Sequence, residues 1–202
     1  MKSKQIVIVF ILFLVSSTIQ AQTSGWINLF DGKSLDGWKA SEHPSTFSVG
    51  DSGIVVFGDR AHLFYDGSVN NHNFKNFEFK VKVLTKPGSN SGLFIHTTYQ
   101  ETGWPSKGYE IQVNNTHTDW RKTGSIYAVQ DVKEVFVKDN EWFIEHIIVQ
   151  GKKITVKIND NIINEYTEGE SGRLSGGTIA LQGHDPKSKV YYKEVMIKIL
   201  PD

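Results

Sequence analysis

The strongest constraint on the fold of this chain is its succession of short alternating runs separated by turn residues. Residues 77–83 alternate apolar with charged side chains, which is the period of a strand with one buried face. Roughly a dozen such short runs follow one another, with turn sequences such as Asp31-Gly32 and Gly50-Asp51-Ser52-Gly53 between them. No segment has a clear apolar period of 3.6 residues. We therefore expect one all-β domain, folded as two antiparallel sheets packed in a sandwich.

The N-terminal segment predicts export. Lys2 and Lys4 precede an unbroken apolar run from residue 6 to residue 15, and Ala21 offers a cleavage point. This run is too short to cross a bilayer but fits the core of a signal peptide. We expect residues 1–21 to be removed and residues 22–202 to form a single exported domain, periplasmic or secreted and with no transmembrane segment. The absence of cysteine excludes a lipid anchor on cysteine and any disulfide.

Charge and missing motifs exclude other function classes. Acidic and basic residues are balanced at 22 each, two of the basic ones in the signal segment, so nothing predicts binding to nucleic acid or to an acidic membrane surface. No phosphate-binding glycine loop, no His-Glu-x-x-His and no Gly-x-Ser-x-Gly is present. The spacing Glu-x-Asp-x-x-Glu, expected of a glucanase on a similar sandwich, is missing as well. Ordinary hydrolysis by two carboxylates is therefore disfavoured.

An unusually polar strand face marks the candidate site. In residues 108–117, Tyr109, Ile111 and Val113 alternate with Glu110, Gln112 and Asn114, so a carboxylate and two amides share one face. The same alternation puts Phe94 and His96 on one face of residues 93–99, and Gln182 on the polar face of residues 177–182, with His184 just beyond. If these strands are neighbours, their polar side chains meet. An ordinary solvated face is the alternative.

The candidate functional residues are dispersed along the chain rather than gathered in one motif. Tyr127 is expected in the core rather than in the site. His43, His62, His72 and His146 are expected to be structural. The full set of candidates is His96, Glu110, Gln112, Asn114, His117, Asp119, Arg121, Lys122, Tyr127, Gln182, His184 and Asp185.

Six segments in register resemble the 3-keto-disaccharide hydrolase domain family. They are Asn28-Leu29-Phe30-Asp31-Gly32-Lys33-Ser34-Leu35-Asp36-Gly37-Trp38, Asn90-Ser91-Gly92-Leu93-Phe94-Ile95-His96, Gly108-Tyr109-Glu110-Ile111-Gln112, Thr123-Gly124-Ser125-Ile126-Tyr127, Asn140-Glu141-Trp142 and Ala180-Leu181-Gln182-Gly183-His184-Asp185. The resemblance implies a concanavalin-like jelly-roll sandwich. It also implies a hydrolase that acts on glycosides whose sugar carries a ketone at C3. An upstream glycoside 3-dehydrogenase is one source that could supply this ketone.

That chemistry needs a base near C2, a group that holds the C3 oxygen and an acid for the leaving oxygen. Either Glu110 or His184 is expected to abstract the C2 proton. His96, Lys122 or a divalent metal would hold the enolate; His96, Glu110 and His184 are the candidate ligands of such an ion. Substrate hydroxyls and rings would be bound by Gln112, Asn114, His117, Arg121, Tyr127, Gln182 and Asp185, with Trp104 or Trp120 stacking on the sugar.

Two other functions fit the same residues less fully. A non-catalytic carbohydrate-binding module would need the aromatic and amide side chains but no base that converges with them. An extracellular adhesion domain would need no cluster of Glu110, His96 and His184.

Overall fold

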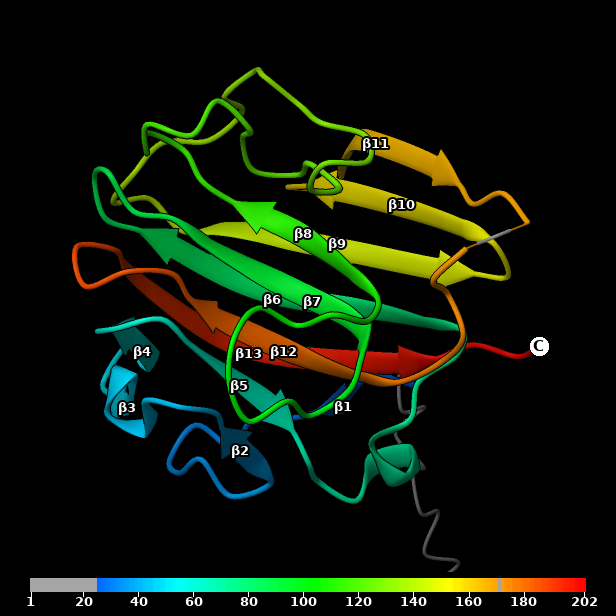
Figure 1. Ribbon diagram of the computed structural model, residues 1–202, viewed down its shortest axis with the longest axis horizontal. Helices are drawn as coiled ribbons and strands as arrows, with labels where there is room; N and C mark the ends of the chain where they lie inside the picture. The colour runs from blue at the N-terminus through cyan, green and yellow to red at the C-terminus, as the bar shows by residue number, and fades with distance from the viewer. Residues whose placement is uncertain (1–24, 171) are drawn as a thin grey trace, which may run out of the picture.

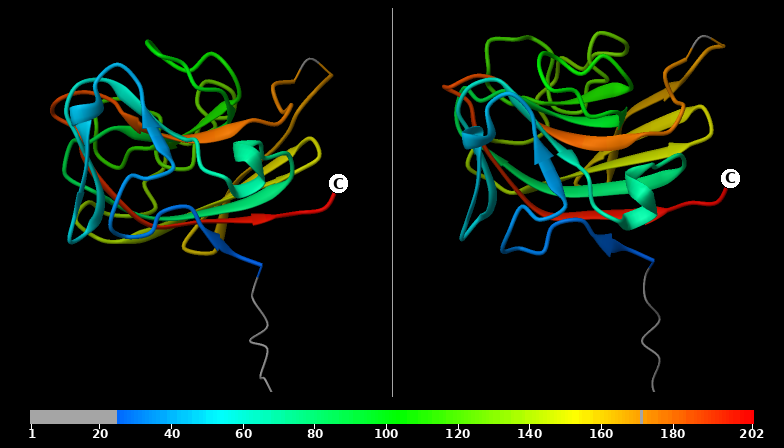
Figure 2. Two further views of the ribbon diagram at one scale, coloured as in Figure 1. Left: turned by 90° about the horizontal axis from the view of Figure 1, so that it is seen from below. Right: turned by 60° about the horizontal axis from the view of Figure 1, so that its bottom comes forward.

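Two antiparallel sheets packed face to face form the protein (Figure 1, Figure 2). The computed structural model describes residues 25–170 and 172–202, and the expected signal peptide lies outside this part of the chain. The all-β sandwich predicted from the alternating runs is confirmed. No helix within the described residues is long and apolar enough to cross a membrane.

The larger sheet has eight strands in the order β11-β10-β9-β6-β13-β4-β3, with β1 paired to β13. Its strands are β1 (Ile27–Asn28), β3 (Phe47–Gly50), β4 (Gly53–Phe57), β6 (Phe77–Thr85), β9 (Phe143–Gln150), β10 (Lys153–Ile158), β11 (Asn161–Thr167) and β13 (Lys189–Ile199). The predicted hairpin between β3 and β4 is present. Gly53 closes it with a φ of +107°, where a Cβ would lie 2.3 Å from the carbonyl oxygen of Tyr192, so no larger residue fits.

The smaller sheet has five strands in the order β2-β5-β12-β7-β8. Its strands are β2 (Trp38–Ala40), β5 (Ala61–Tyr65), β7 (Ser91–Thr97), β8 (Tyr109–Val113) and β12 (Thr178–Gly183), and two short 3₁₀ turns, η1 (Pro44–Thr46) and η2 (Val69–His72), lie outside both sheets. Because β8 is an edge strand, its Glu110 and Gln112 lie beside β7, and β12 is the next strand along.

The core lies between the two inner faces. In β6 the alternation is followed residue by residue: Phe77, Phe79, Val81 and Val83 are completely buried, and the charged residues between them are half-exposed. Each such side chain stabilises the fold by about 1.5–3 kcal/mol. The smaller sheet differs, because β5, β7 and β12 are buried on both faces. Its outer face must therefore be covered by other parts of the chain.

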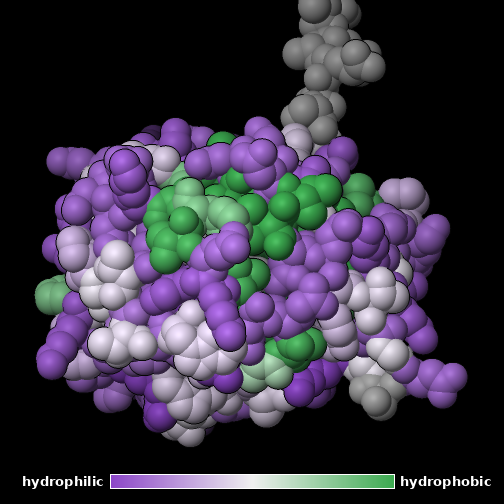
Figure 3. Space-filling view, turned by 90° about the horizontal axis from the view of Figure 1, so that it is seen from above, coloured by the Kyte–Doolittle hydropathy of each residue, from purple (hydrophilic) through white to green (hydrophobic). Residues whose placement is uncertain are grey.

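Two long connections provide much of this cover. Residues 98–108 join β7 to β8 and cross in front of β12 and β5 (Figure 1). Residues 114–142 join β8 to β9 without a named strand or helix, as the sequence suggested for most of this stretch. Figure 3 shows apolar surface gathered on the side where this connection and β11 lie; Val135, Phe136 and Ile162 are exposed large hydrophobic residues of these elements.

Candidate active site

The side chain of Glu110, on β8, extends over the neighbouring strand β7 on the outer face of the smaller sheet. Gln182 Nε2, on β12, donates a hydrogen bond of 2.7 Å to Glu110 Oε1 on β8. The strand between them is β7, where Gly92 is the partner of Gln112. Since Gly92 has no side chain, the carboxylate can lie over the backbone of β7. Two residues more than 70 positions apart are thereby joined at one point.

The surroundings of Glu110 change its acidity. Burial raises the pKa of Glu110 to about 7, the negative charge of Asp119 adds to the rise, and the hydrogen bond from Gln182 opposes it. A carboxylate with this pKa is ionised in a substantial fraction of molecules at neutral pH and is more basic than an ordinary glutamate. Such values are what proton transfer at neutral pH requires.

A pocket of about 290 Å³ opens above Glu110. It is lined by Asn90, Phe94, Trp104, Pro105, Ser106, Gly108, Glu110, Gln112, Tyr127, Arg173, Gln182 and His184. The alternation predicts converging faces for Glu110, Gln112, Gln182 and His184, and the structure brings all four together. Trp104 and Tyr127 also line the pocket, and both are partly exposed at its mouth.

Two buried amides present unpaired oxygens beside Glu110. Gln112 and Gln182 are each 1% exposed. Gln112 donates through Nε2 to Asn90 Oδ1 at 2.9 Å, and Gln182 donates to Glu110, but within the described residues neither Oε1 has a hydrogen-bond partner. A buried acceptor without a donor costs about 1–3 kcal/mol. A ligand with hydroxyl groups would supply the missing donors.

His184 is oriented by its neighbour in the chain. Asp185 Oδ2 lies 2.7 Å from His184 Nδ1. Burial opposes ionisation of Asp185, but the hydrogen bonds from His184, Ser188 and Lys187 hold its pKa at about 2. The ionised carboxylate can only accept, so His184 Nδ1 carries the proton of this bond. In the neutral ring, Nε2 is then free to accept.

The family model of the 3-keto-alpha-glucoside-1,2-lyase-like domain matches residues 25–198. The chain belongs to this family. The concanavalin-like sandwich implied by the resemblance in the sequence is confirmed together with the family.

Named relatives are consistent with the family. A 3-keto-disaccharide hydrolase of Bacteroides thetaiotaomicron is 25% identical over a match covering 75% of this chain and 61% of that protein, so the chain spans about three fifths of the relative's length. A crystal structure of a Parabacteroides distasonis protein, provisionally named a glycosyl hydrolase, has a TM-score of 0.72 at 25% identity and covers 88% of this chain and 94% of its own. The carbohydrate-binding module CBM66 of Bacillus subtilis has a TM-score of 0.61 at 12% identity, covering 80% and 95% of the two chains, which reflects the shared fold alone.

His96 does not lie in the pocket of this family member, which corrects the expectation that it shares a face with Phe94. The pairing of β7 with β12 shifts register near this point, and His96 has a left-handed φ of 53°. This bulge turns the ring away from the outer face. Its Nε2 lies 2.9 Å from the carbonyl oxygen of Lys75, and its ring packs on Phe77 of the core. His96 therefore contacts neither Glu110 nor His184 and cannot join them as a metal ligand.

Lys122 and Asn114 are also committed elsewhere. Lys122 Nζ donates to the carbonyl oxygens of His117 and Asp119 at 2.8 Å each, and Asn114 Nδ2 donates to those of Asp119 and Arg121. Both side chains hold the 114–142 connection in shape. The expectations that Lys122 stabilises an enolate and that Asn114 binds substrate are corrected by this placement, because neither side chain lines the pocket.

The remaining candidates lie around the pocket rather than in it. Arg121 pairs with Asp131 and stacks over Trp120 and Tyr127. Trp120 borders a separate shallow depression, so of the two tryptophans only Trp104 can contact a ligand in the main pocket. His117 packs against the ring of His184.

A cluster that could hold a metal consists of His117, His184 and Asp185, with donor atoms within 4.8 Å of one another. The carboxylate of Asp185 and the Nδ1 atom of each histidine are already paired. Asp185 accepts from His184 and Ser188, and His117 Nδ1 accepts the backbone N–H of Asp119 at 3.1 Å. A ligating histidine usually donates its second nitrogen to an acceptor, and His117 does the reverse. This donor set fits a metal ion poorly.

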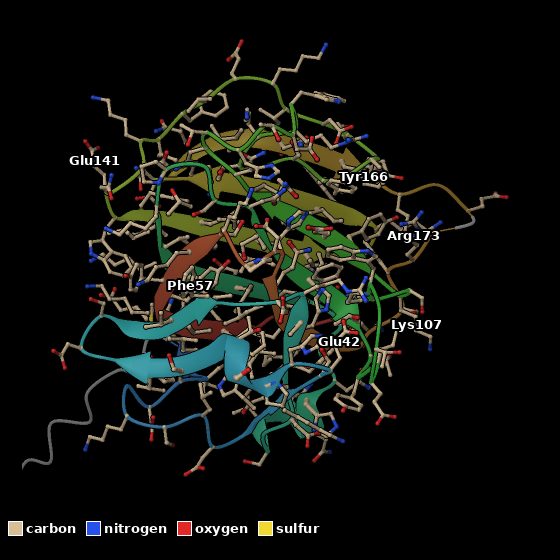
Figure 4. The ribbon with its side chains drawn as sticks, turned by 60° about the vertical axis from the view of Figure 1, so that its left-hand side comes forward. Glu42, Phe57, Lys107, Glu141, Tyr166 and Arg173 are labelled. Carbon is tan, nitrogen blue, oxygen red and sulfur yellow. The ribbon has the colours of Figure 1, made fainter. Side chains whose placement is uncertain are left out.

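Six residues of the pocket lining were not predicted from the sequence: Asn90, Phe94, Pro105, Ser106, Gly108 and Arg173. Phe94 had been placed on the correct face but without a role. Asn90 orients Gln112, and its position two residues before Gly92 within a family segment was the available signal. Arg173 lies in the connection between β11 and β12, for which alternation gives no signal. Figure 4 shows Arg173 on the same side of the molecule as Lys107 and Glu42.

Proposed function

We propose that the chain cleaves 3-keto-glycosides, including 3-keto-disaccharides, by elimination followed by hydration, with Glu110 as the base. The observation that carries the proposal is the carboxylate of Glu110, held at the bottom of a sugar-sized pocket with a pKa of about 7. The family match and the name of the Bacteroides relative support it. A single tuned carboxylate suits this route, whereas standard glycoside hydrolysis uses two flanking carboxyl groups.

The reaction balances without any redox partner. The ketone at C3 acidifies the proton on C2, which Glu110 removes; the electron pair first forms an enolate and then expels the oxygen on C1. The leaving alcohol takes up one proton, and the sugar becomes an enone with a C1=C2 double bond. Water then adds across this bond, placing hydroxyl on C1 and hydrogen on C2, so the sum of the two steps is hydrolysis.

The other pocket residues have roles that follow from their contacts. Gln182 fixes the carboxylate of Glu110 and offers its free Oε1 to a sugar hydroxyl, as Gln112 does. His184, held by Asp185, carries the proton to the leaving oxygen when its ring is protonated. Because Phe94 and Trp104 make part of the wall apolar, water is partly excluded and the charged interactions inside are strengthened.

The test uses a 3-keto-glucoside and its unoxidised parent as paired substrates. We expect release of the alcohol from the keto substrate only. We expect Glu110→Gln to lower turnover about 100-fold or more, the size of effect typical of a lost general base. Deuterium at C2 should slow the reaction. Binding of the sugar without any alcohol release by the wild-type protein would instead identify a non-catalytic carbohydrate-binding module.

We also propose that the protein is exported, because the apolar run of residues 6–15 has the length of a signal-peptide core. Expression of the full chain in a bacterium should yield a periplasmic or secreted protein that begins near residue 22. N-terminal sequencing of the product measures this directly. An uncleaved protein in the cytoplasmic fraction would reject the assignment without affecting the proposed chemistry.

A further inference from the structure

His62 is buried without any hydrogen-bond partner, directly behind the pocket wall. It is 0% exposed, and neither ring nitrogen has a partner within the described residues. The ring packs edge-on against Phe94 and Trp104, with centroids 5.2 and 5.7 Å away. Burial lowers the pKa of His62 to about 4, so the ring is neutral and offers one donor and one acceptor. Leaving both unpaired is costly, so a ligand that supplies partners would recover free energy.

His62 extends the row of polar groups that forms the floor of the pocket. It is the direct partner of Gln182 across β5 and β12, and Gln112 is the partner of Gly92 on β8 and β7. His62, Gln182 and Gln112 are each at most 1% exposed, and each has a polar atom without a partner. Three strand spacings separate the ends of this row, about 14 Å in all. That length accommodates two sugar rings side by side, with Glu110 under one of them.

Trp104 covers the His62 end of the row. Its side chain is 46% exposed, although it contacts both His62 and His184. The 98–108 segment that carries it is braced largely from within, because Gln100 donates to the carbonyl oxygens of Thr102 and Trp104 and accepts from the backbone of Ser106. It can therefore move as one body.

The start of this segment is held by Tyr99, which packs on Phe64 and lies under Lys39 Nζ. Beyond Tyr99, the part that carries Trp104 has few contacts with the rest of the chain. Glu42 accepts the backbone N–H of Gly103 at 3.3 Å, and Arg60, paired with Glu42, lies over the Trp104 ring at 5.2 Å. Glu42 lies on the pocket side of the molecule, the side shared by Lys107 and Arg173 (Figure 4). Segments attached by only a few contacts open at lower free-energy cost than the strands of the core.

We propose that His62 and Trp104 form a second saccharide subsite, which receives the leaving-group sugar when the 98–108 segment lifts from the sheet. This inference rests on the proposed function, because the leaving group is attached to C1, the carbon next to the one that Glu110 deprotonates. A second ring is thereby directed from Glu110 past His184 toward His62. The ring of His62 binds two hydroxyls of this sugar, one as donor and one as acceptor, and Trp104 closes on its apolar face.

The first test compares two substrates of different leaving group. His62→Phe keeps an aromatic ring and removes both nitrogens. We expect it to lower kcat/KM at least tenfold for a 3-keto-disaccharide and less than threefold for the methyl 3-keto-glucoside, while raising Tm. His62→Gln, which keeps a donor and an acceptor, should recover part of the loss. Equal losses on the two substrates, or none on either, would overturn the subsite.

The second test measures binding without turnover, so that its failure is separable from failure of the proposed function. Titration with the unoxidised disaccharide should change tryptophan emission in the wild type. The change should vanish in Trp104→Phe and persist in the control Trp26→Phe, because Trp26 packs on His146, away from the pocket. His62→Phe should weaken this binding at least tenfold. A protein that binds in this way but cleaves no keto substrate would refute only the reaction, and one whose affinity is unaffected by His62→Phe would refute the subsite.

Discussion

Gly92 lies directly beneath the side chain of Glu110. A Cβ at residue 92 would stand 2.5 Å from Glu110 Oε1 and 2.8 Å from its Cγ, closer than any non-bonded contact allows. The bare backbone of β7 is thus what lets the carboxylate cross from β8 to Gln182 on β12. The catalytic geometry that we propose therefore requires a glycine at residue 92.

Gly92→Ala should therefore displace Glu110 without unfolding the protein. We expect kcat/KM to fall tenfold or more and the free energy of unfolding to fall by about 1–3 kcal/mol, the cost of an overpacked site. Urea denaturation and steady-state kinetics measure the two effects. Gly50→Ala is the matched control, because a Cβ there meets only Val55 at an ordinary 3.5 Å. Full activity of Gly92→Ala would contradict the importance of this crossing.

The acidity of Glu110 predicts a rising pH profile. If Glu110 is the base, kcat/KM for a 4-nitrophenyl 3-keto-glucoside, whose leaving oxygen needs no proton from His184, should increase about tenfold per pH unit below pH 7 and level off above it, since the pKa of the carboxyl is about 7. Gln182→Met removes the hydrogen bond that lowers this pKa, so the midpoint should move to higher pH, with much of the activity recovered in alkaline buffer. A profile that falls through pH 7, or a midpoint unchanged in Gln182→Met, would count against Glu110 as the base.

Alternation predicted the sheets and the centre of the site because each depends on which face a residue occupies. Glu110, Gln112 and Gln182 could be placed together from period 2 alone. His96 could not, because a single left-handed residue at the β7 bulge reverses the face, and nothing in the local pattern predicts it. His62 was passed over although its own run alternates: with Phe64 it shares the face opposite Leu63 and Tyr65.

Connections were harder to predict than strands. Lys122 looked available because lysines usually face solvent, yet its ammonium group binds two backbone carbonyls of the 114–142 connection. Such contacts depend on the path of the whole connection, which no short-range pattern determines. The same holds for Trp104, whose contact with His62 follows from how residues 98–108 fold back over the sheet.

Glu145 predicts how stability depends on pH. It is completely buried in β9 within the core, neither carboxyl oxygen has a hydrogen-bond partner among the described residues, and burial raises its pKa well above 4.5. Above pH 4.5 the unfolded chain loses this proton while the folded chain keeps it, so stability falls as pH rises. The slope is about 1.4 kcal/mol per pH unit up to the pKa in the folded protein.

Glu145→Gln should remove this slope. The difference in unfolding free energy between the variant and the wild type should therefore grow in favour of the variant as pH rises above 4.5, as measured by urea denaturation at each pH. Subtracting the two curves cancels the contribution of Glu110, which has the same sign and ends near pH 7. A difference that stays constant with pH would mean that Glu145 titrates normally in the folded protein.

The pair of His184 and Asp185 predicts a loss that depends on the leaving group. Asp185→Asn keeps an oxygen for the backbone of Lys187 and Ser188 but no longer compels His184 Nδ1 to carry the proton. With a poor leaving group, such as a second sugar, we expect kcat to fall about 100-fold or more, because proton delivery to the leaving oxygen is impaired. A 4-nitrophenyl 3-keto-glucoside, whose leaving oxygen needs no proton, should lose less than tenfold. Equal losses on both substrates would show that Asp185 acts only through the shape of its turn.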